Sequence, residues 1–112
     1  MKKIEAIIRV TQFEAVRDAL AEVGVQFFTL SEVRGYGLQK GAKLVYRGAN
    51  HGADFIARLQ MDILVHADKV GSVIKAIEES GRTGKVGDGK ILVLNVDSVV
   101  RIRTGERDEA AL

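Results

Sequence analysis

The sequence predicts an α+β fold in which two β-α-β units share one four-stranded antiparallel sheet with two helices. The first observation behind this prediction is an internal repeat. A strand, a helix start, an apolar helical stripe and a glycine stop occur twice, with an offset of 57 residues. The second observation is periodicity, because apolar residues alternate where strands are predicted and follow a helical spacing between them. The 112 residues have the size of one domain, so residues 1–112 are treated as a single unit.

The first unit begins with an apolar segment at residues 4–10, which predicts a strand. Thr11 is followed three residues later by Glu14, and this spacing is typical of a capping box at a helix start. An apolar stripe at helical spacing comes next, and Gly24 predicts the end of the helix. The second strand is expected at residues 25–33.

The second unit repeats this order. Residues 61–65 correspond to the first strand, Asp68 takes the N-cap position of Thr11, and Gly81 corresponds to Gly24. Residues 91–96 close the unit as a strand. Two such units give the order βαββαβ, which is the ferredoxin-like plan. Its two helices cover one face of the sheet. Because the strands are apolar on both faces, we expect a second copy of the chain to cover the other face, as a homo-oligomer.

A connection of about 20 residues, at about 36–55, joins the two units. Together with Gly35 it contains five glycines, it carries several polar and aromatic side chains, and it is much longer than a hairpin loop. We expect it to become ordered when a ligand or a partner binds.

A glycine-rich loop is predicted at residues 82–90, where three glycines and two lysines stand close together. Gly84, Gly89 and Lys90 have the spacing of a P-loop, but Ile91 stands where a P-loop has Ser or Thr, and a strand follows instead of a helix. Backbone N–H groups and lysine can still hold phosphates. The loop is therefore either a phosphate cradle of another kind or an ordinary turn with solvated lysines.

The C-terminal segment, residues 99–112, adds Arg101 and Arg103. These two residues point the same way if the segment is extended. Hydrogen bonds to charged groups contribute about 1.5–3 kcal/mol each. If both arginines converge with Lys90, a polyphosphate is the natural ligand. If they do not, they are solvated surface charges.

Composition excludes several classes of function. The chain has no cysteine, so disulfides and thiolate chemistry are excluded and the cytoplasm is expected. No apolar run approaches the roughly 20 residues of a membrane span. His51 and His66 lack the neighbours of a metal site. The few aromatic residues provide little surface for stacking nucleic-acid bases.

The motifs at residues 35–41, 46–49, 83–91 and 101–106 resemble those of the PII nitrogen-regulatory signal-transduction family, and the similarity extends over the whole chain. The resemblance implies a trimer of ferredoxin-like subunits with ATP or ADP in each cleft between subunits. It also implies that the long loop contacts a target protein. 2-Oxoglutarate would bind with Mg-ATP at the base of that loop.

The resemblance assigns roles by position. Thr29, Asp62, Leu64 and Thr83 would surround the base and ribose, and Gly35, Gly37 and Leu38 would approach the nucleotide through their backbone. The phosphates would meet Gly87, Asp88, Gly89 and Lys90, with Arg101 and Arg103 reaching across the subunit boundary. Gly37, Gln39, Lys40 and Arg58 would bind 2-oxoglutarate, with Gln39 also on Mg²⁺, and Tyr46, Arg47, Asn50 and His51 would contact the partner.

The chain departs from the family in the long loop and just after it. His51 stands where many relatives have a nucleotidylated tyrosine, and Ala49 where some have a phosphorylated serine, so neither modification is expected. Asn50 replaces a common acidic residue. Arg58 replaces the lysine that pairs with 2-oxoglutarate, and Ala57 replaces the proline before it. An arginine can still hold a carboxylate through two hydrogen bonds.

The resulting expectation is a non-catalytic regulator of nitrogen-metabolism targets, such as an ammonium transporter or the regulation of glutamine synthetase. The first alternative is a PII-like sensor of a different small molecule that regulates another transporter. The second is a weak ATPase, and the third is a nucleic-acid binder, which the shortage of aromatic residues on the strands disfavours.

Overall fold

A computed structural model describes residues 1–37 and 55–112, and its element order confirms the predicted βαββαβ plan. The strands are β1 (Lys2–Ile8), β2 (Thr29–Tyr36), β3 (Phe55–Val65) and β4 (Gly89–Asn95). The helices are α1 (Phe13–Glu22) and α2 (Val70–Gly81). Short 3₁₀ turns are η1 (Val10–Gln12), η3 (Ala67–Lys69) and η4 (Asp108–Ala111). None of the helices in these two ranges is long and apolar enough to cross a membrane.

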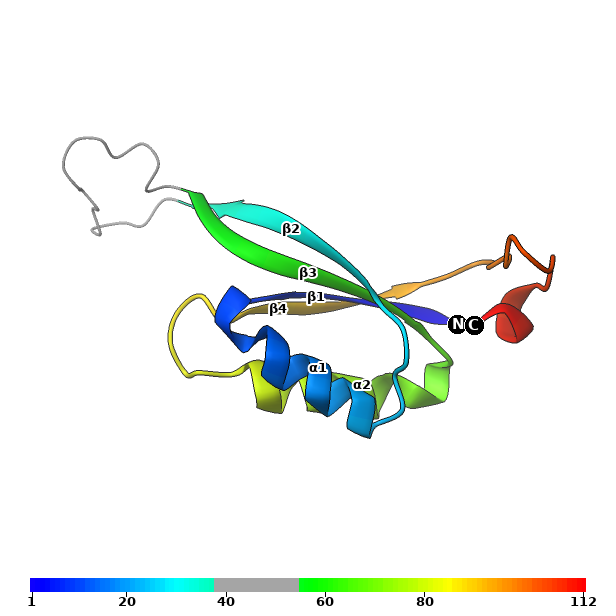
Figure 1. Ribbon diagram of the computed structural model, residues 1–112, viewed down its shortest axis with the longest axis horizontal. Coiled ribbons are helices and arrows are strands. Elements are labelled where there is room, and N and C mark those ends of the chain that lie inside the picture. The colour runs from blue at the N-terminus through cyan, green and yellow to red at the C-terminus, as the bar shows by residue number, and fades with distance from the viewer. Residues whose placement is uncertain (38–54) are drawn as a thin grey trace.

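The four strands form one antiparallel sheet in the order β2-β3-β1-β4, with β1 and β3 in the middle. Ile4 of β1 lies opposite Ile63 of β3 on one side and Val93 of β4 on the other. The two helices lie side by side on one face of the sheet (Figure 1). β2 and β3 continue well beyond the helices, and their pairing extends to Tyr36 and Phe55.

The hydrophobic core lies between the helices and this face of the sheet. The alternation predicted in the second unit is confirmed, because every second residue of β3 from Leu59 to Val65 is buried. The other buried apolar side chains come from β1 and from both helices, and they are Ile4, Ala6, Ile8, Val16, Leu20, Val73 and Ile77.

The opposite face of the sheet has no helix on it. Leu64, Leu92 and Leu94 belong to this face by register and are 46%, 43% and 40% exposed. These three large apolar side chains stand on β3 and β4, the strands on either side of β1, and form a surface that a partner can cover.

Both predicted helix N-caps are wrong. Thr11 lies inside η1 and Asp68 inside η3, and the residues at the N-cap positions are Gln12 and Lys69, with no capping hydrogen bond from a side chain. Glu14 therefore has no capping box to complete. In both units a 3₁₀ turn comes before the helix, and the N–H of Gln12 and of Lys69 bonds to the carbonyl three residues earlier at 3.0 Å.

Strand bounds also differ from the predicted ones. The first strand ends at residue 8 instead of 10, and the second runs over 29–36 instead of 25–33. After α1 the chain first turns back, with the N–H of Val25 bonded to the carbonyl of Leu20 at 3.0 Å, so residues 25–28 do not join the sheet. The last strand begins at Gly89 instead of 91 because it pairs with β1 along the whole length of that strand.

Candidate functional site

The glycine loop leaves the end of α2, enters β4 at Gly89 and is closed by the carboxylate of Asp88. One oxygen of this carboxylate, Oδ2, accepts hydrogen bonds from the backbone N–H groups of Thr83 (2.8 Å) and Gly84 (2.9 Å). The other, Oδ1, accepts from the Thr83 hydroxyl (2.5 Å) and from Nε of Arg9 (2.8 Å). The Arg9 guanidinium, the Thr83 hydroxyl and the two N–H groups stabilise the charged form, so the pKa of Asp88 lies well below its usual value.

Arg9 also binds the crest of the loop, residues 85–87. Its Nη2 donates to the carbonyl of Val86 at 2.8 Å and lies 3.5 Å from the carbonyl of Lys85. A single guanidinium at the end of β1 therefore contacts both Asp88 and the backbone of the crest. This role could not be predicted from the sequence, in which Arg9 is only a charge near the end of an apolar run.

The expected phosphate cradle is smaller than the predicted loop. The N–H groups of Thr83 and Gly84 are bonded to Asp88, and that of Lys85 is bonded to the Thr83 hydroxyl at 3.2 Å. Within residues 1–37 and 55–112, the N–H groups of the next three residues, 86–88, have no hydrogen-bond acceptor. These three are the N–H groups that remain for an anion.

Two of the predicted glycines are required by the geometry of the loop. Gly89 has φ +109°, and a Cβ there would lie 1.8 Å from the carbonyl oxygen of Ile7. Gly87 has φ +104°, and a Cβ there would lie 2.8 Å from Nη2 of Arg58 and 3.3 Å from Nη2 of Arg9. Two guanidinium groups therefore lie beside Gly87, one of them from the predicted 2-oxoglutarate residue Arg58.

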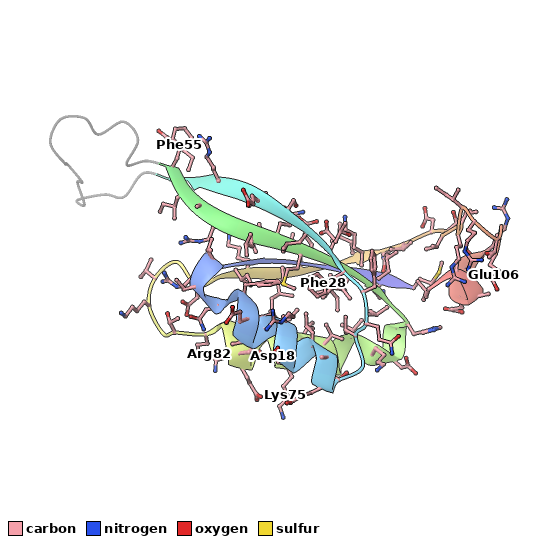
Figure 2. The ribbon with its side chains drawn as sticks, viewed as in Figure 1. Asp18, Phe28, Phe55, Lys75, Arg82 and Glu106 are labelled. Atoms are coloured by element: carbon pink, nitrogen blue, oxygen red, sulfur yellow. The ribbon has the colours of Figure 1, made fainter. Side chains whose placement is uncertain are left out.

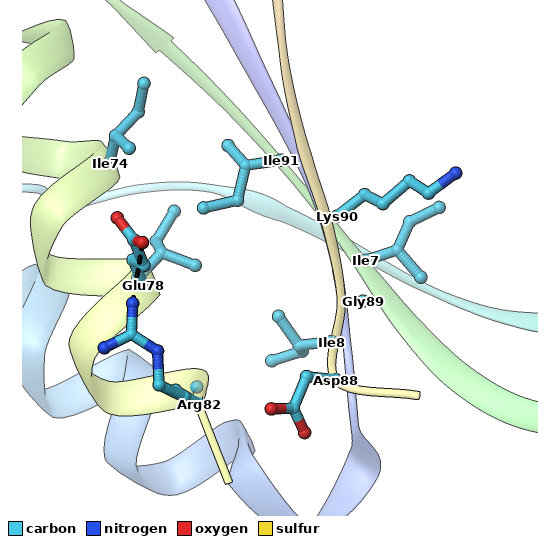
Figure 3. Close-up of a pocket in the computed structure, with 11 residues that line it drawn as sticks. Ile7, Ile8, Ile74, Glu78, Arg82, Asp88, Gly89, Lys90 and Ile91 are labelled. Atoms are coloured by element: carbon cyan, nitrogen blue, oxygen red, sulfur yellow. Dashed lines mark hydrogen bonds and ion pairs between the residues drawn. The ribbon is translucent and has the colours of Figure 1, made fainter. Parts of the chain in front are cut away.

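Lys90 follows Gly89 on β4, and its side chain points to the face of the sheet without helices. Figure 3 shows Lys90 and Ile7 directed away from α2, whereas Asp88 and Ile91 lie on the helix side. A cavity of about 390 Å³ lies on that helix side, against the end of α2. The ammonium group of Lys90 points away from this cavity, so a ligand of Lys90 would bind on the other face of the sheet.

Three of the four residues expected at the base and ribose form a second group, whereas the fourth, Thr83, lies in the glycine loop bonded to Asp88. Thr29 of β2 pairs with Asp62 of β3, and Leu64 lies two residues further along β3. The three residues line a hollow of about 640 Å³ together with Arg101 and Leu112. The structure thus brings four predicted nucleotide residues to one hollow. The carboxylate of Asp62 also lies 3.8 Å from the ammonium of a lysine on β1.

The prediction that Arg101 and Arg103 share one side of an extended segment is wrong. Residues 102–104 form a turn, in which the N–H of Gly105 bonds to the carbonyl of Arg101 at 2.8 Å. The guanidinium of Arg101 forms an ion pair with Glu106. The turn is closed by local backbone hydrogen bonds between Arg101 and residues 105 and 106, which the spacing of the two arginines does not reveal.

The glycine loop and the C-terminal segment lie at opposite ends of the sheet, and Thr29 and Asp62 lie between them, level with Leu92 of β4. Gly89 and Asn95 are the two ends of β4, which corresponds to about 20 Å at about 3.3 Å per residue. The glycine loop adjoins the first end, and the C-terminal segment lies past the other (Figure 1). Figure 2 shows the same separation between Phe55, at the outer end of β3, and Glu106. Within one chain, Lys90 and Arg101 therefore do not converge on one ligand.

The remaining predicted residues are divided between the described and the undescribed parts of the chain. Gly35 pairs with Ile56 near the outer end of β2, and Gly37 follows that strand. Leu38, Gln39, Lys40, Tyr46, Arg47, Ala49, Asn50 and His51 lie outside the described residues, so their roles stay predictions.

Comparison with known proteins agrees with this architecture. The family model described as "Nitrogen regulatory protein P-II" matches residues 1–106. A nitrogen regulatory protein P-II of Pasteurella multocida is 49% identical over 112 residues, and nitrogen regulatory protein P-II 1 of Escherichia coli K12 is 48% identical. In both comparisons the alignment covers 100% of each chain.

A solved structure shows the same fold. The crystal structure of Arabidopsis thaliana PII bound to citrate superposes with a TM-score of 0.81 at 43% sequence identity. The match covers 99% of this chain and 91% of the Arabidopsis chain. The relatives are named as regulatory proteins, and the match extends over both groups of site residues. The chain therefore belongs to the nitrogen regulatory protein P-II family.

Proposed function

We propose that this protein is a cytoplasmic, non-catalytic regulator that binds ATP or ADP between neighbouring copies of a homotrimer. In this proposal it acts through its long loop on a nitrogen-metabolism target, such as an ammonium transporter or the regulation of glutamine synthetase. The observation that carries the proposal is the separation of the predicted site into two incomplete halves. One half has the glycine loop and Lys90, and the other has Thr29, Asp62, Leu64 and Arg101.

A trimer accounts for this separation. Arg101 lies past the end of the sheet opposite the glycine loop, so a head-to-tail arrangement places the loop end of one copy beside the C-terminal end of the next. The same arrangement covers the exposed leucines of the helix-free face, Leu64, Leu92 and Leu94. Lys90 points to that face, as an anion site between copies requires.

The chemistry of both halves suits a nucleotide. The unbonded N–H groups of residues 86–88 and the ammonium of Lys90 can hold phosphate oxygens. The hollow beside Thr29 and Leu64 has the polar and apolar surface that a base and ribose need. Arg101 lines the same hollow, so its guanidinium can reach a phosphate held by the next copy. Mg²⁺ would enter with ATP, and Gln39 is the residue expected to contact it.

The nucleotide is proposed as a signal and not as a substrate. Asp88 is the carboxylate closest to the loop, and its two oxygens already accept four hydrogen bonds. Because the pKa of this carboxylate is lowered, it is a poor general base for activating water.

A mixing experiment tests the shared site directly. Lys90→Gln and Arg101→Gln should each weaken ATP and ADP binding about ten-fold or more, because each removes one charge-assisted contact. If every cleft needs Lys90 from one copy and Arg101 from the next, an equal mixture of the two variants, unfolded and refolded together, restores about a quarter of the clefts. Isothermal titration calorimetry counts those sites.

Two results would contradict the proposal. One is a monomer in analytical ultracentrifugation, and the other is the absence of heat when ATP or ADP is added to the wild type. If the mixture has no more high-affinity sites than either variant alone, nucleotide binding does not use a cleft between copies.

Arg58 supports a carboxylate effector beside the nucleotide. Its Nη2 would lie 2.8 Å from a Cβ at Gly87, so the guanidinium is next to the proposed phosphate site. With Mg-ATP present, 2-oxoglutarate should bind there, and titration with and without Mg-ATP measures the coupling. The citrate bound by the Arabidopsis relative is also a carboxylate. If 2-oxoglutarate leaves ATP affinity unchanged, the second candidate, a PII-like sensor of another small molecule for another transporter, is favoured.

A further inference from the structure

We propose that Arg9 is a positioning residue that sets the conformation of the glycine loop before a ligand binds. Arg9 would act through Asp88 and the crest of the loop, without contacting the ligand. The inference rests on the proposed nucleotide site for its functional consequence. The contacts of Arg9 with Asp88 and with the carbonyl of Val86, which together we call the brace, do not depend on that site.

The first argument is the direction of the peptide groups at the crest. All peptide bonds in the described residues are trans, so each C=O points away from the N–H of the following residue. Arg9 binds the carbonyl of Val86 at 2.8 Å and lies near that of Lys85. The N–H groups in the same two peptide planes belong to Gly87 and Val86. They are therefore turned away from Arg9, and they are among the N–H groups left without an acceptor in the described residues.

The second argument is that one side chain fixes both parts of the loop. The stem is closed by Asp88, which binds the N–H groups of Thr83 and Gly84, and the same carboxylate is bound by Nε of Arg9 at 2.8 Å. The crest is bound by Nη2 of Arg9. A guanidinium has donors in a planar fork and can form both contacts, whereas an ammonium has no such fork.

The third argument concerns the glycines of the loop. Gly84 and Gly87 have φ +88° and +104°, and glycine loses more conformational freedom on ordering than any other residue. Fixing the backbone of a flexible loop costs conformational entropy. A loop ordered in advance spares the ligand this cost and binds it more tightly. The ion pair is also partly sheltered, with Arg9 and Asp88 side chains 23% and 25% exposed.

The test uses full-length Arg9→Gln and Arg9→Lys, with Arg17→Gln as the matched control. Arg17 also has a carboxylate partner, Asp18 at 3.1 Å, but it lies on the exposed side of α1, away from the loop. Amide hydrogen exchange by NMR is measured on the ligand-free protein. Isothermal titration calorimetry then measures the affinities for ATP, ADP and AMP.

We expect Arg9→Gln to speed exchange at Thr83 and Gly84 about ten-fold or more, with exchange in β1 and β3 unchanged. ATP affinity should fall about ten-fold, and the preference for ATP over AMP should shrink, because the lost contacts are to phosphates. Arg9→Lys should restore only part of both effects. Arg17→Gln should behave as the wild type, since a purely structural surface role does not change phosphate preference.

Three outcomes overturn the inference. The first is loop exchange and ATP affinity within two-fold of the wild type in Arg9→Gln. The second is lost affinity with unchanged loop exchange, which would make Arg9 a direct ligand contact. The third is wild-type protection of the loop amides and wild-type ATP affinity in Arg9→Lys. This outcome decides the question if Arg9→Gln does not fold. If the wild type binds no nucleotide, the proposed function fails, and the exchange data alone decide whether the brace exists.

Discussion

The two halves of the chain follow the same β-α-β plan, but their connections from helix to strand are closed in different ways. In the first half, Gly24 has φ +89°, and the N–H groups of Val23, Gly24 and Val25 all bond to carbonyls of α1 at 3.0–3.1 Å. Lys69 then donates to the carbonyl of Val23 at 2.8 Å. The N–H groups of residues 23–25 are therefore not available to a ligand.

In the second half, side chains close the connection. The N–H groups of Thr83 and Gly84 bond to the Asp88 carboxylate, and the carbonyl of Val86 bonds to Arg9. The N–H groups of residues 86–88 are left without acceptors in the described parts of the chain. The comparison teaches that a turn closed by its own helix uses up its peptide groups. A turn closed by side chains can present them to an anion.

Gly89 and Gly24, one glycine from each connection, should differ most in their response to substitution. Gly89→Ala places a Cβ 1.8 Å from the backbone oxygen of Ile7 at φ +109°, so β4 must move away from β1. We expect a loss of about 2–4 kcal/mol in the free energy of unfolding, together with loss of nucleotide binding. Urea denaturation and calorimetric titration measure the two effects.

Gly24→Ala is the matched control for this prediction. Its Cβ would meet only the flexible end of Lys69, at 3.1 Å from Nζ, although its φ of +89° still disfavours alanine. The expected loss is about 1–2 kcal/mol. Nucleotide affinity should be unchanged. Equal effects of the two substitutions on ATP binding would show that the second connection contributes no more to the nucleotide site than the first.

The contrast also shows what the sequence could and could not predict. Periodicity and the repeat gave the order of strands and helices, because burial on one face imposes a pattern that can be read along the chain. Gly87 and Gly89 could be selected because close approach and positive φ favour glycine. The contact between Arg9 and Asp88 could not be predicted, because it requires the register that places Ile8 opposite Gly89.

Local backbone geometry accounts for the wrong predictions. A capping box assumes that the helix begins directly after Thr11, and a 3₁₀ turn takes that place. The shared direction of Arg101 and Arg103 assumed an extended segment, and the chain turns there. Whether Arg101 meets Lys90 depends on a second copy of the chain, which the sequence of one copy does not describe.

Acid should loosen the second connection and leave the first intact. The pKa of Asp88 is lowered in the folded state, so its contribution to stability is present above the unfolded value near 4 and is lost as pH falls below it. The first connection is closed by backbone groups and by Lys69, without a carboxylate. In ligand-free protein, amide exchange at Thr83 and Gly84 should therefore accelerate below about pH 4, beyond the intrinsic pH dependence, before exchange at Gly24 and Val25 does so.

Asp88→Asn is the control for the acid effect. An amide in place of the carboxylate presents N–H groups to donors of Arg9 or of the loop, so the variant should be less stable than the wild type at pH 7. The difference should narrow as the wild type is acidified. A difference that stays constant between pH 7 and pH 3 would contradict the charge-based account.

The smallest effect is expected where the two halves are most alike, at their helix starts. A working N-cap contributes about 1 kcal/mol, but Thr11 and Asp68 lie inside 3₁₀ turns and do not cap their helices. Thr11→Ala and Asp68→Ala should therefore each change the free energy of unfolding by less than about 0.5 kcal/mol, as measured by urea denaturation. A loss of about 1 kcal/mol in only one variant would mean that the two halves begin their helices differently in solution. In that half the sequence-based cap would then be right, and the 3₁₀ turn would not be the stable start of the helix.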